Sequence, residues 1–378
     1  MTALFNPDSA NPVVKISTAN KKSFLLGQTF LGASLLFALN DASAATFNLP
    51  KATDGLIDNG MGKPVYVRAK QEESLIDIAV KHLLGQEEIV RANKGVDRWL
   101  PGEDTEVRIP SSYLLPDAPR QGIVINLPEY RLYYYPPGKG KVISYSVGIG
   151  RVDWKTPLGV TKVVGKVKNP TWTPPPSIKA EHLAKGDPLP DVWPAGADNP
   201  LGLFAFRLGI PGYLLHSTNK PQGVGMQVSH GCMRLYPKDI EQMFPIVGVG
   251  TQVNIINQPV KIGWSNGQLY VESHPNLEGE ETSYQQRLDI ALNLIEKASV
   301  SRPVSVNGEA LRTALEESNG LPTVISNADF VPVDTENLDA NIPSYETEGK
   351  VSRSQIEKEL QEEEMQEREF RNSPFPKY

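Results

Sequence analysis

The sequence predicts a mainly β fold, and three observations support this prediction. Between residues 122 and 167, β-branched and aromatic runs are separated by proline and glycine turns, with no helical period between them. Residues 62–111 begin and end with strand character and have two helical stretches between. A longer helical period follows at residues 284–298. We therefore expect a β domain, a small βααβ unit before it and a partly helical extension after it.

The length and the charge narrow the class of protein. A chain of 378 residues is long enough for two or three domains. The formal net charge is -6, from 38 Lys and Arg against 44 Asp and Glu. Binding to nucleic acid requires basic side chains clustered on one face, and the composition gives no sign of this. We expect no nucleic-acid partner.

The first 44 residues have the order of a secretory signal peptide. A basic region with Lys15, Lys21 and Lys22 comes first. An apolar run at residues 24–39 and the small residues 42–44 follow, which is the A-x-A pattern of a cleavage site after residue 44. The run is short and contains glycines, which favours cleavage over an uncleaved membrane anchor. We expect residues 1–44 to be removed on export, leaving no stable membrane span.

Residues 62–111 predict the βααβ unit. Alternation over residues 65–70 indicates a first strand. Ser74 can cap a helix, with Asp77 three residues on as its capping-box partner. A second helical stretch at residues 87–93 and a final strand at residues 107–110 complete the unit.

Residues 120–258 hold the expected β domain. Strands are expected at residues 123–127, 131–135, 142–149, 160–167, 203–208, 213–215 and 251–256, with a short helix at 238–244. A proline-rich stretch, residues 169–202, interrupts them, and a loop this long is usually either a functional lid or disordered. Trp154, Trp172 and Trp193 favour an ordered cover.

Residues 259–350 form the expected extension. A strand at residues 269–272 can extend a sheet, and the helix at residues 284–298 has an apolar face. Residues 351–378 are densely charged with almost no apolar face, so we expect a solvated or disordered tail.

The segment from His216 to Leu235 holds the residues best suited to chemistry. It contains Cys232, the only cysteine in the chain, and two of the five histidines, His216 and His230. A cysteine reacts as the thiolate, and a free pKa of about 8.5 requires a neighbouring base or positive charge near neutrality. In an exported chain an unpaired thiol is a liability, which makes an inert buried cysteine the weaker interpretation.

Two other chemistries fit this segment less well. A zinc site could use His216, His230 and Cys232, but paired C-x-x-C spacing and an obvious fourth ligand are absent from the sequence around them. A papain-type peptidase places its cysteine before its histidine, the reverse of the order here. We therefore expect a cysteine nucleophile that uses neither a metal nor a cofactor.

The segment Ser229-His230-Gly231-Cys232-Met233-Arg234, with His216 upstream, resembles the L,D-transpeptidase family of YkuD type. The resemblance extends from about residue 122 to residue 257 and includes the proline-rich residues 169–175 and 194–202. It implies a β-sandwich-like catalytic domain.

Two positions depart from the family pattern. Ser217 stands where the family usually has glycine after the upstream histidine. Arg234 stands where some branches have asparagine, and the arginine form is similar to the Gram-negative periplasmic branch.

The resemblance implies a role for each catalytic residue. Cys232 would attack an amide carbonyl to give a thioester, and His216 would be the general base, oriented by a backbone carbonyl for which Ser217 is the candidate. Gly231 would permit a tight turn that aims the N–H groups of Gly231 and Cys232 at the developing oxyanion. His230 would either shape this oxyanion pocket or brace the loop.

Three further residues are candidates for substrate binding. Arg234 can bind a substrate carboxylate through two hydrogen bonds, although a structural ion pair is an equal alternative. Ser229 lies beside the motif and can equally form a local turn bond. Ser217 adds a side chain close to the base.

The βααβ unit resembles a LysM module. The similar residues are Glu73 to Ala79, Ile89 to Asn93, Pro101-Gly102 and Val107 to Pro110. The resemblance implies binding to the N-acetylglucosamine-containing glycan of a cell wall. A spacer that packs on the next domain and binds nothing is the alternative.

Together the resemblances imply an exported enzyme of the cell wall, with peptidoglycan stem peptides and glycan strands as its partners. The acyl donor would be a tetrapeptide stem, cut after the L-centre of meso-diaminopimelate with release of D-alanine. The acceptor would be another diaminopimelate amine, giving a 3-3 cross-link, or a lysine of an outer-membrane lipoprotein. Water as acceptor would make the enzyme a hydrolase, an L,D-carboxypeptidase, and a non-catalytic wall-binding protein is the remaining alternative.

Overall fold

The computed structural model describes residues 45–51, 54–58, 63–300 and 302–327. The expected signal peptide, residues 1–44, and the expected charged tail, residues 351–378, lie outside the described residues. In the described part of the chain, every helix is too short or too polar to cross a bilayer.

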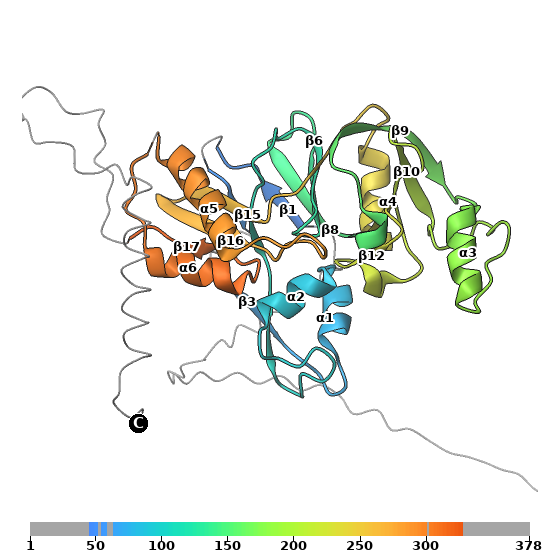
Figure 1. Ribbon diagram of the computed structural model, residues 1–378, viewed down its shortest axis with the longest axis horizontal. Helices are drawn as coiled ribbons and strands as arrows, with labels where there is room; N and C mark the ends of the chain where they lie inside the picture. The colour runs from blue at the N-terminus through green and yellow to red at the C-terminus, as the bar shows by residue number, and fades with distance from the viewer. Residues whose placement is uncertain (1–44, 52–53, 59–62, 301, 328–378) are drawn as a thin grey trace, which may run out of the picture. The chain divides into compact units, whose positions relative to one another are not determined.

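The main domain is one large β sheet that closes on itself (Figure 1). Its strands are β1 (Ala45–Asn48), β6 (Gly122–Asn126), β7 (Arg131–Tyr135), β8 (Lys141–Gly150), β9 (Gly159–Lys168), β10 (Phe204–Leu208), β11 (Leu214–His216), β12 (Gln227–Ser229), β13 (Met233–Leu235) and β14 (Gln252–Ile256). They follow the order β1-β8-β13-β11-β10-β9-β14-β6-β7, with β12 beside β8. A further pairing of β7 with β8 closes the sheet, so the expected sandwich-like domain is a barrel. The mainly β prediction is confirmed.

Apolar side chains from all sides of the barrel form its core. Fully buried examples are Ile123, Leu132, Val147, Phe206 and Val253. Successive side chains of a strand point to opposite faces, and on β6 and β7 the outward-facing neighbours Val124 and Tyr133 are also buried, in a second apolar cluster. This part of the sheet is therefore packed on both faces.

The proline-rich stretch contains a helix that its composition concealed, α3 (Pro176–Ala184). Pro176 occupies its first turn, where a missing N–H is tolerated. Backbone hydrogen bonds between Trp172 and Trp193, at 2.9 and 2.6 Å, close the stretch at its base. The expected helix at residues 238–244 is α4 (Pro237–Ile246), and two short 3-10 turns are η1 (Val152–Trp154) and η2 (Pro221–Gly223).

Before the barrel, β3 (Val65–Arg68), α1 (Leu75–His82), α2 (Gln86–Ala92) and β4 (Glu106–Ile109) form the βααβ unit, with β3 and β4 antiparallel. The predicted capping box is present. Ser74 Oγ accepts from the Asp77 N–H at 3.1 Å, and Asp77 Oδ2 accepts from the Ser74 N–H at 3.0 Å. Leu75, Ile89 and Val107 are fully buried between the helices and the strands.

After the barrel, a smaller sheet and two helices pack together (Figure 1). The sheet contains β15 (Val260–Ser265), β16 (Gln268–Ser273) and β17 (Thr323–Val324), and the helices are α5 (Tyr284–Ser299) and α6 (Gly308–Glu317). A separate pair, β2 (Leu56–Asp58) and β5 (Ser112–Leu114), precedes the barrel. Helix α5 lies where the sequence predicted it, whereas β15 and α6 were not predicted.

A buried charge cluster around Lys261 of β15 joins this extension to the barrel. The ammonium lies 2.9 Å from Glu129 Oε1 and 2.6 Å from Glu272 Oε1, and it donates to the Leu114 carbonyl at 2.6 Å. Glu129 lies in the turn between β6 and β7, and Glu272 lies in β16. Because buried charges require charged and hydrogen-bonded partners, this cluster fixes the two parts against each other.

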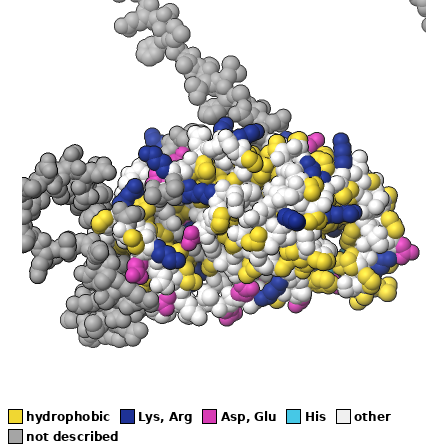
Figure 2. Space-filling view, turned by 90° about the horizontal axis from the view of Figure 1, so that it is seen from above, with side chains coloured by type: hydrophobic (Ala, Val, Ile, Leu, Met, Phe, Trp, Pro, Cys, Tyr) yellow, Lys and Arg dark blue, Asp and Glu magenta, His cyan; other side chains and the backbone are white. Residues whose placement is uncertain are grey.

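Basic side chains do not form a block on the face that Figure 2 shows. Lys and Arg side chains lie there among hydrophobic, acidic and uncharged ones. This surface is unlike the continuous basic stripe that binds nucleic acid.

The βααβ unit is bonded directly to the segment that leads into the chemical motif. The Gln86 N–H donates to the Val224 carbonyl at 3.0 Å, and the Glu87 N–H donates to the Gly225 carbonyl at 3.2 Å. Gly225 has φ +78°, and a Cβ there would lie 2.2 Å from Gly85 Cα. Only glycine permits this approach of two backbones.

The Gly225→Ala variant is therefore expected to lose stability through this contact. The matched control is Gly250→Ala, because Gly250 has φ +93° and no atom within 4 Å of a built Cβ. The control is expected to lose about 1 kcal/mol from its strained backbone alone. Thermal unfolding of the two variants measures the difference, and equal shifts in the midpoint would show that the contact is unimportant.

Candidate active site

One cavity of about 460 Å³ contains most of the chemical residues that the sequence singled out. Its polar lining includes His216, Ser229, His230, Cys232 and Arg234. Its aromatic wall consists of Trp154, Trp172, Trp193 and Tyr213. The proline-rich stretch with α3 therefore covers this cavity.

The pairing of β11 with β13 brings the motif together. These strands are parallel, and His216 at the end of β11 is in register with Arg234 in β13. Cys232 directly precedes β13, two residues before Arg234. Although sixteen positions separate His216 and Cys232 in the sequence, both line the same cavity.

His216 is buried, with 4% of its surface exposed. Burial, and then the positive charge of Arg234, lowers its pKa to about 3, although the Ser217 and Leu201 carbonyls oppose this shift. Its Nδ1 lies 2.5 Å from the Ser217 carbonyl oxygen, which can only accept, so Nδ1 carries the hydrogen. The ring is then neutral near pH 7, and Nε2 has the lone pair that a general base requires.

Cys232 has a neutral thiol in the resting site. Burial raises the pKa of this thiol, while the Leu214 N–H and the Arg234 charge act in the opposite direction. Its Sγ lies 3.5 Å from the Gly212 carbonyl oxygen, to which the S–H donates. The resting site therefore contains a neutral thiol and a neutral imidazole, and the proton must move when the sulfur attacks.

The loop that presents the sulfur is fixed by close packing. Gly231 has φ +97°, and a Cβ there would lie 2.8 Å from the Tyr213 ring. Thr156 donates its hydroxyl to the Gly231 carbonyl at 2.9 Å and accepts from the Gly150 N–H at 3.0 Å. Glycine is required at position 231, and the backbone around it has little freedom.

His230 contacts residues that the sequence did not single out. Its Nε2 lies 3.0 Å from Oε2 of Glu181 on α3, and its ring meets the Trp154 ring edge-on with centroids 5.2 Å apart. Arg151 donates to the same carboxylate at 3.0 and 2.5 Å. Nothing in the local sequence relates residues 49 positions apart, so only the fold reveals Glu181 and Arg151 at this site.

The three candidates for substrate binding have different positions. Arg234 lines the cavity, and its Nε is buried without a hydrogen-bond partner among the described residues. Ser229 also lines the cavity, but its hydroxyl donates to the Cys232 carbonyl at 2.5 Å, which is a local turn bond. Ser217 is buried and is not among the lining residues, so its contribution to the site is the carbonyl that holds His216.

A group of metal-ligand type lies elsewhere, beside the Lys261 cluster. Glu129, Glu272 and His274 have potential ligand atoms within 4.8 Å of one another. The Lys261 ammonium lies within 3 Å of both carboxylates, as described above, and His274 Nε2 lies 2.7 Å from Glu272 Oε1. Protein cations already pair with these carboxylates, Lys261 with both and Arg131, whose Nε lies 4.0 Å from Glu129 Oε1, with one, so the group is a structural ion cluster.

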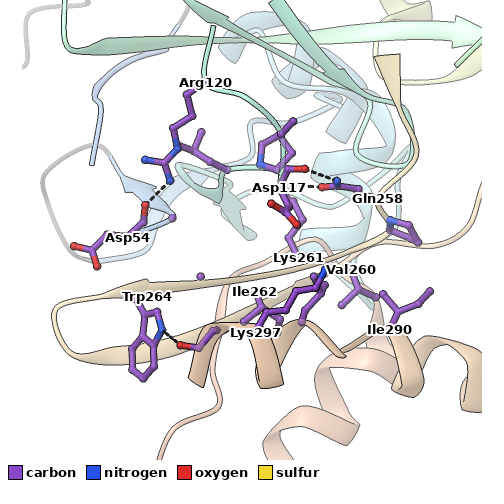
Figure 3. A pocket seen from close by; sticks show the side chains of 18 of the residues that line it. Asp54, Asp117, Arg120, Gln258, Val260, Lys261, Ile262, Trp264, Ile290 and Lys297 are labelled. Atoms are coloured by element: carbon purple, nitrogen blue, oxygen red, sulfur yellow. Dashed lines mark hydrogen bonds between the residues drawn. The ribbon is translucent and has the colours of Figure 1, made fainter. Parts of the chain in front are cut away.

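A second hollow, of about 680 Å³, lies between β15, α5 and the segment before the barrel (Figure 3). Arg120 crosses it and donates to the Asp54 carbonyl at 2.6 Å, and Asp117 is hydrogen-bonded to Gln258. Its lining contains neither cysteine nor histidine. The thiol chemistry therefore belongs to the smaller cavity.

A β barrel that holds a lone thiol and a neutral histidine in one cavity defines the class of protein as an enzyme. The family model of the L,D-transpeptidase catalytic domain, YkuD, matches residues 120–255. This chain is 44% identical over 286 residues to "Probable L,D-transpeptidase YcfS" of Escherichia coli (strain K12), covering 74% of this chain and 88% of that protein. From the same organism, "Probable L,D-transpeptidase YbiS" is 39% identical over 284 residues, which cover 74% of this chain and 92% of that protein. A third protein of this organism, "Probable L,D-transpeptidase ErfK/SrfK", is 37% identical over 300 residues, which cover 78% of this chain and 94% of that protein. The chain belongs to the L,D-transpeptidase family.

The neutral resting site predicts how Cys232 reacts with iodoacetamide. Because burial disfavours the thiolate, the alkylation rate is expected to rise with pH to a midpoint above the ordinary thiol pKa of about 8.5. Arg234→Gln removes a charge that favours the thiolate, so its midpoint is expected at a higher pH than that of the wild type. With one cysteine in the chain, the modified site is unambiguous. A midpoint below 7 would instead indicate a preformed thiolate–imidazolium pair.

Proposed function

We propose that this L,D-transpeptidase cuts peptidoglycan tetrapeptide stems after the L-centre of meso-diaminopimelate and transfers the acyl group to an amine. The observation that supports this proposal is the cavity shared by Cys232, a lone thiol, and His216, a neutral histidine. Membership of the family supplies the substrate class. The fold alone would not, because one fold supports many reactions.

The first half-reaction is acylation of Cys232. As Sγ attacks the carbonyl carbon, His216 Nε2 takes the thiol proton, so that no free thiolate accumulates. The tetrahedral oxyanion is stabilised by the N–H groups of Gly231 and Cys232. His216 then returns the proton to the leaving nitrogen, the C–N bond breaks, and D-alanine departs from a thioester.

The second half-reaction transfers the acyl group. An amine attacks the thioester carbonyl, His216 accepts its proton, and the thiol is regenerated with a new amide bond. A diaminopimelate amine would give a 3-3 cross-link, and a lysine amine would attach an outer-membrane lipoprotein. The cover over the cavity, with Trp172 and Trp193 in its wall, limits access of water and favours transfer over hydrolysis.

Arg234 supports both half-reactions from β13, where it is in register with His216 of β11. Its charge lowers the pKa of the thiol and favours the negative charge that develops during attack. Its buried Nε has no protein partner among the described residues, which leaves a donor for a carboxylate of the stem peptide. Ser217 acts through its carbonyl, and His230 braces the loop.

The mechanism is tested with a tetrapeptide stem, with and without a diaminopimelate-containing acceptor, by mass spectrometry of the products. The wild-type enzyme is expected to release D-alanine and to form cross-linked product when the acceptor is present. Cys232→Ala is expected to release none, and His216→Gln to react about 10²- to 10⁴-fold more slowly. D-alanine release by Cys232→Ala at the wild-type rate would refute the thioester. Tripeptide as the sole product at high acceptor concentration would establish an L,D-carboxypeptidase.

The proposal extends to the arrangement of the chain. Residues 62–111 would be a LysM-like module, residues 120–258 the catalytic domain and residues 259–350 an extension, after a signal peptide at residues 1–44. The signal sequence supports a periplasmic location, where peptidoglycan is accessible.

Glycan binding by the module is supported by its βααβ order and by one exposed loop. Trp99 and Leu100, between α2 and β4, are 63% and 70% exposed. Asp97 Oδ1 accepts from both of their N–H groups, at 2.8 and 2.9 Å, which fixes the loop. The exposed indole of Trp99 on this loop offers a large flat surface on which a sugar ring can pack.

Trp99→Ala is accordingly expected to weaken sedimentation of the protein with insoluble peptidoglycan several-fold. The catalytic cavity is not altered, so turnover of a soluble tetrapeptide is expected to remain unchanged. Val249→Ala is the control, because Val249 is also 63% exposed but lies after α4, outside the module. Undiminished sedimentation of Trp99→Ala would favour a spacer that binds nothing through this loop.

A further inference from the structure

Helix α3 covers the cavity with little apolar contact to hold it there. It lies beyond the ends of β9 and β10 (Figure 1). Of its nine residues, only Ile178 is buried, and Leu183 is 66% exposed. A buried aliphatic side chain contributes about 1.5–3 kcal/mol, which is little against the cost of ordering a helix of this length. Other contacts must therefore hold α3 over the cavity.

The carboxylate of Glu181 supplies such contacts to the barrel. It accepts from both terminal nitrogens of Arg151, which directly follows β8, and it pairs with His230 Nε2. All three side chains are largely withdrawn from solvent, with exposed fractions of 28% for Arg151, 20% for Glu181 and 18% for His230. A two-pronged arginine–carboxylate pair at this level of burial is both directional and strong.

The other ion pairs of the proline-rich stretch do not reach the barrel. Lys179 pairs with Asp191, and His182 pairs with Asp187, so both pairs lie within the proline-rich stretch itself. Lys185 also pairs with Glu181, but from the same helix and with 63% of its side chain exposed. Among the ion pairs of the described residues, those of Glu181 with Arg151 and His230 join α3 to the barrel and to the motif.

We propose that Glu181 is a positioning residue for the transpeptidase reaction, which latches α3 over the cavity and orients the His230 ring two residues from Cys232. The inference rests on the proposed function, since it concerns the same site. The latch closes when the carboxylate engages Arg151 and His230 together. Closing the latch encloses the donor peptide, and opening it permits entry and release.

The pKa of His230 depends on the Glu181 carboxylate that forms the latch. The charges that face this ring are Glu181 from α3, Arg151 after β8 and Arg234 in β13, and the ring of His182 lies 6.4 Å away. Burial lowers the pKa of His230, the two arginines lower it further, and Glu181 raises it. Loss of the carboxylate therefore lowers the pKa of His230 again, which a merely structural substitution on α3 would not do.

The test compares Glu181→Gln with Lys179→Gln. Both change one charge on α3, but only the first removes contacts to Arg151 and His230. Glu181→Gln is expected to raise KM for the tetrapeptide donor and the rate of Cys232 alkylation by a bulky neutral maleimide by about tenfold or more. Lys179→Gln is expected to change neither by more than about twofold. Glu181→Asp, which keeps the charge, is expected to recover part of the loss.

The pKa of His230 provides an independent readout. Ring resonances followed by NMR, and assigned with His230→Gln, are expected to titrate at lower pH in Glu181→Gln than in the wild type and at an unchanged pH in Lys179→Gln. Matching thermal midpoints for the three proteins exclude general unfolding. Equal KM, alkylation rate and His230 pKa in the two α3 variants would overturn the proposal. Alkylation and NMR need no turnover, so they remain decisive even if the wild type fails to release D-alanine.

Discussion

The site depends above all on the parallel pairing of β11 with β13. That pairing sets His216 beside Arg234 and, one step before β13 begins, delivers Cys232 to the same cavity. A shift of one residue in either strand would turn a side chain to the other face of the sheet. The closed barrel prevents such a shift, because each of the two strands is held on both sides by a neighbour.

Burial then determines the chemistry that this pairing permits. A neutral thiol and a neutral imidazole in one cavity are stable at its low dielectric, whereas a resting ion pair would have to overcome the loss of hydration. The Ser217 carbonyl fixes which nitrogen of His216 carries the hydrogen. The positive charge of Arg234 acts on both partners, since it disfavours imidazolium and favours thiolate. The proline-rich stretch with α3 lines the same cavity, and Glu181 connects it to the motif through His230.

Features encoded over a few neighbouring residues could be predicted from the sequence. The Ser74–Asp77 capping box, seven of the ten strands of the large sheet and helix α5 are local patterns, whereas the short strands β1, β12 and β13 were not predicted. The motif around Cys232 brought four of the cavity residues together in one segment. Helix α3 was missed because surrounding prolines hide a nine-residue helix. Strand β15 was also missed, although it forms a hairpin with the predicted β16 across Asn266-Gly267, a dipeptide typical of such turns. Glu181 and Lys261 could not be found, since their roles arise from contacts across the fold. The Ser217 carbonyl lies where the resemblance implied, against His216, whereas the Ser217 side chain, also a candidate for substrate binding, is not among the residues that line the cavity.

The central claim is that Cys232 is an activatable thiol in an acyl-transfer site, with His216 as its base. It is tested most directly by intact-mass spectrometry and peptide mapping after brief exposure to a carbapenem, whose strained amide acylates such a thiol. The account predicts one adduct on Cys232 in the wild type, formed far more slowly in His216→Ala. An unmodified Cys232, or an adduct formed equally fast without the histidine, would contradict it.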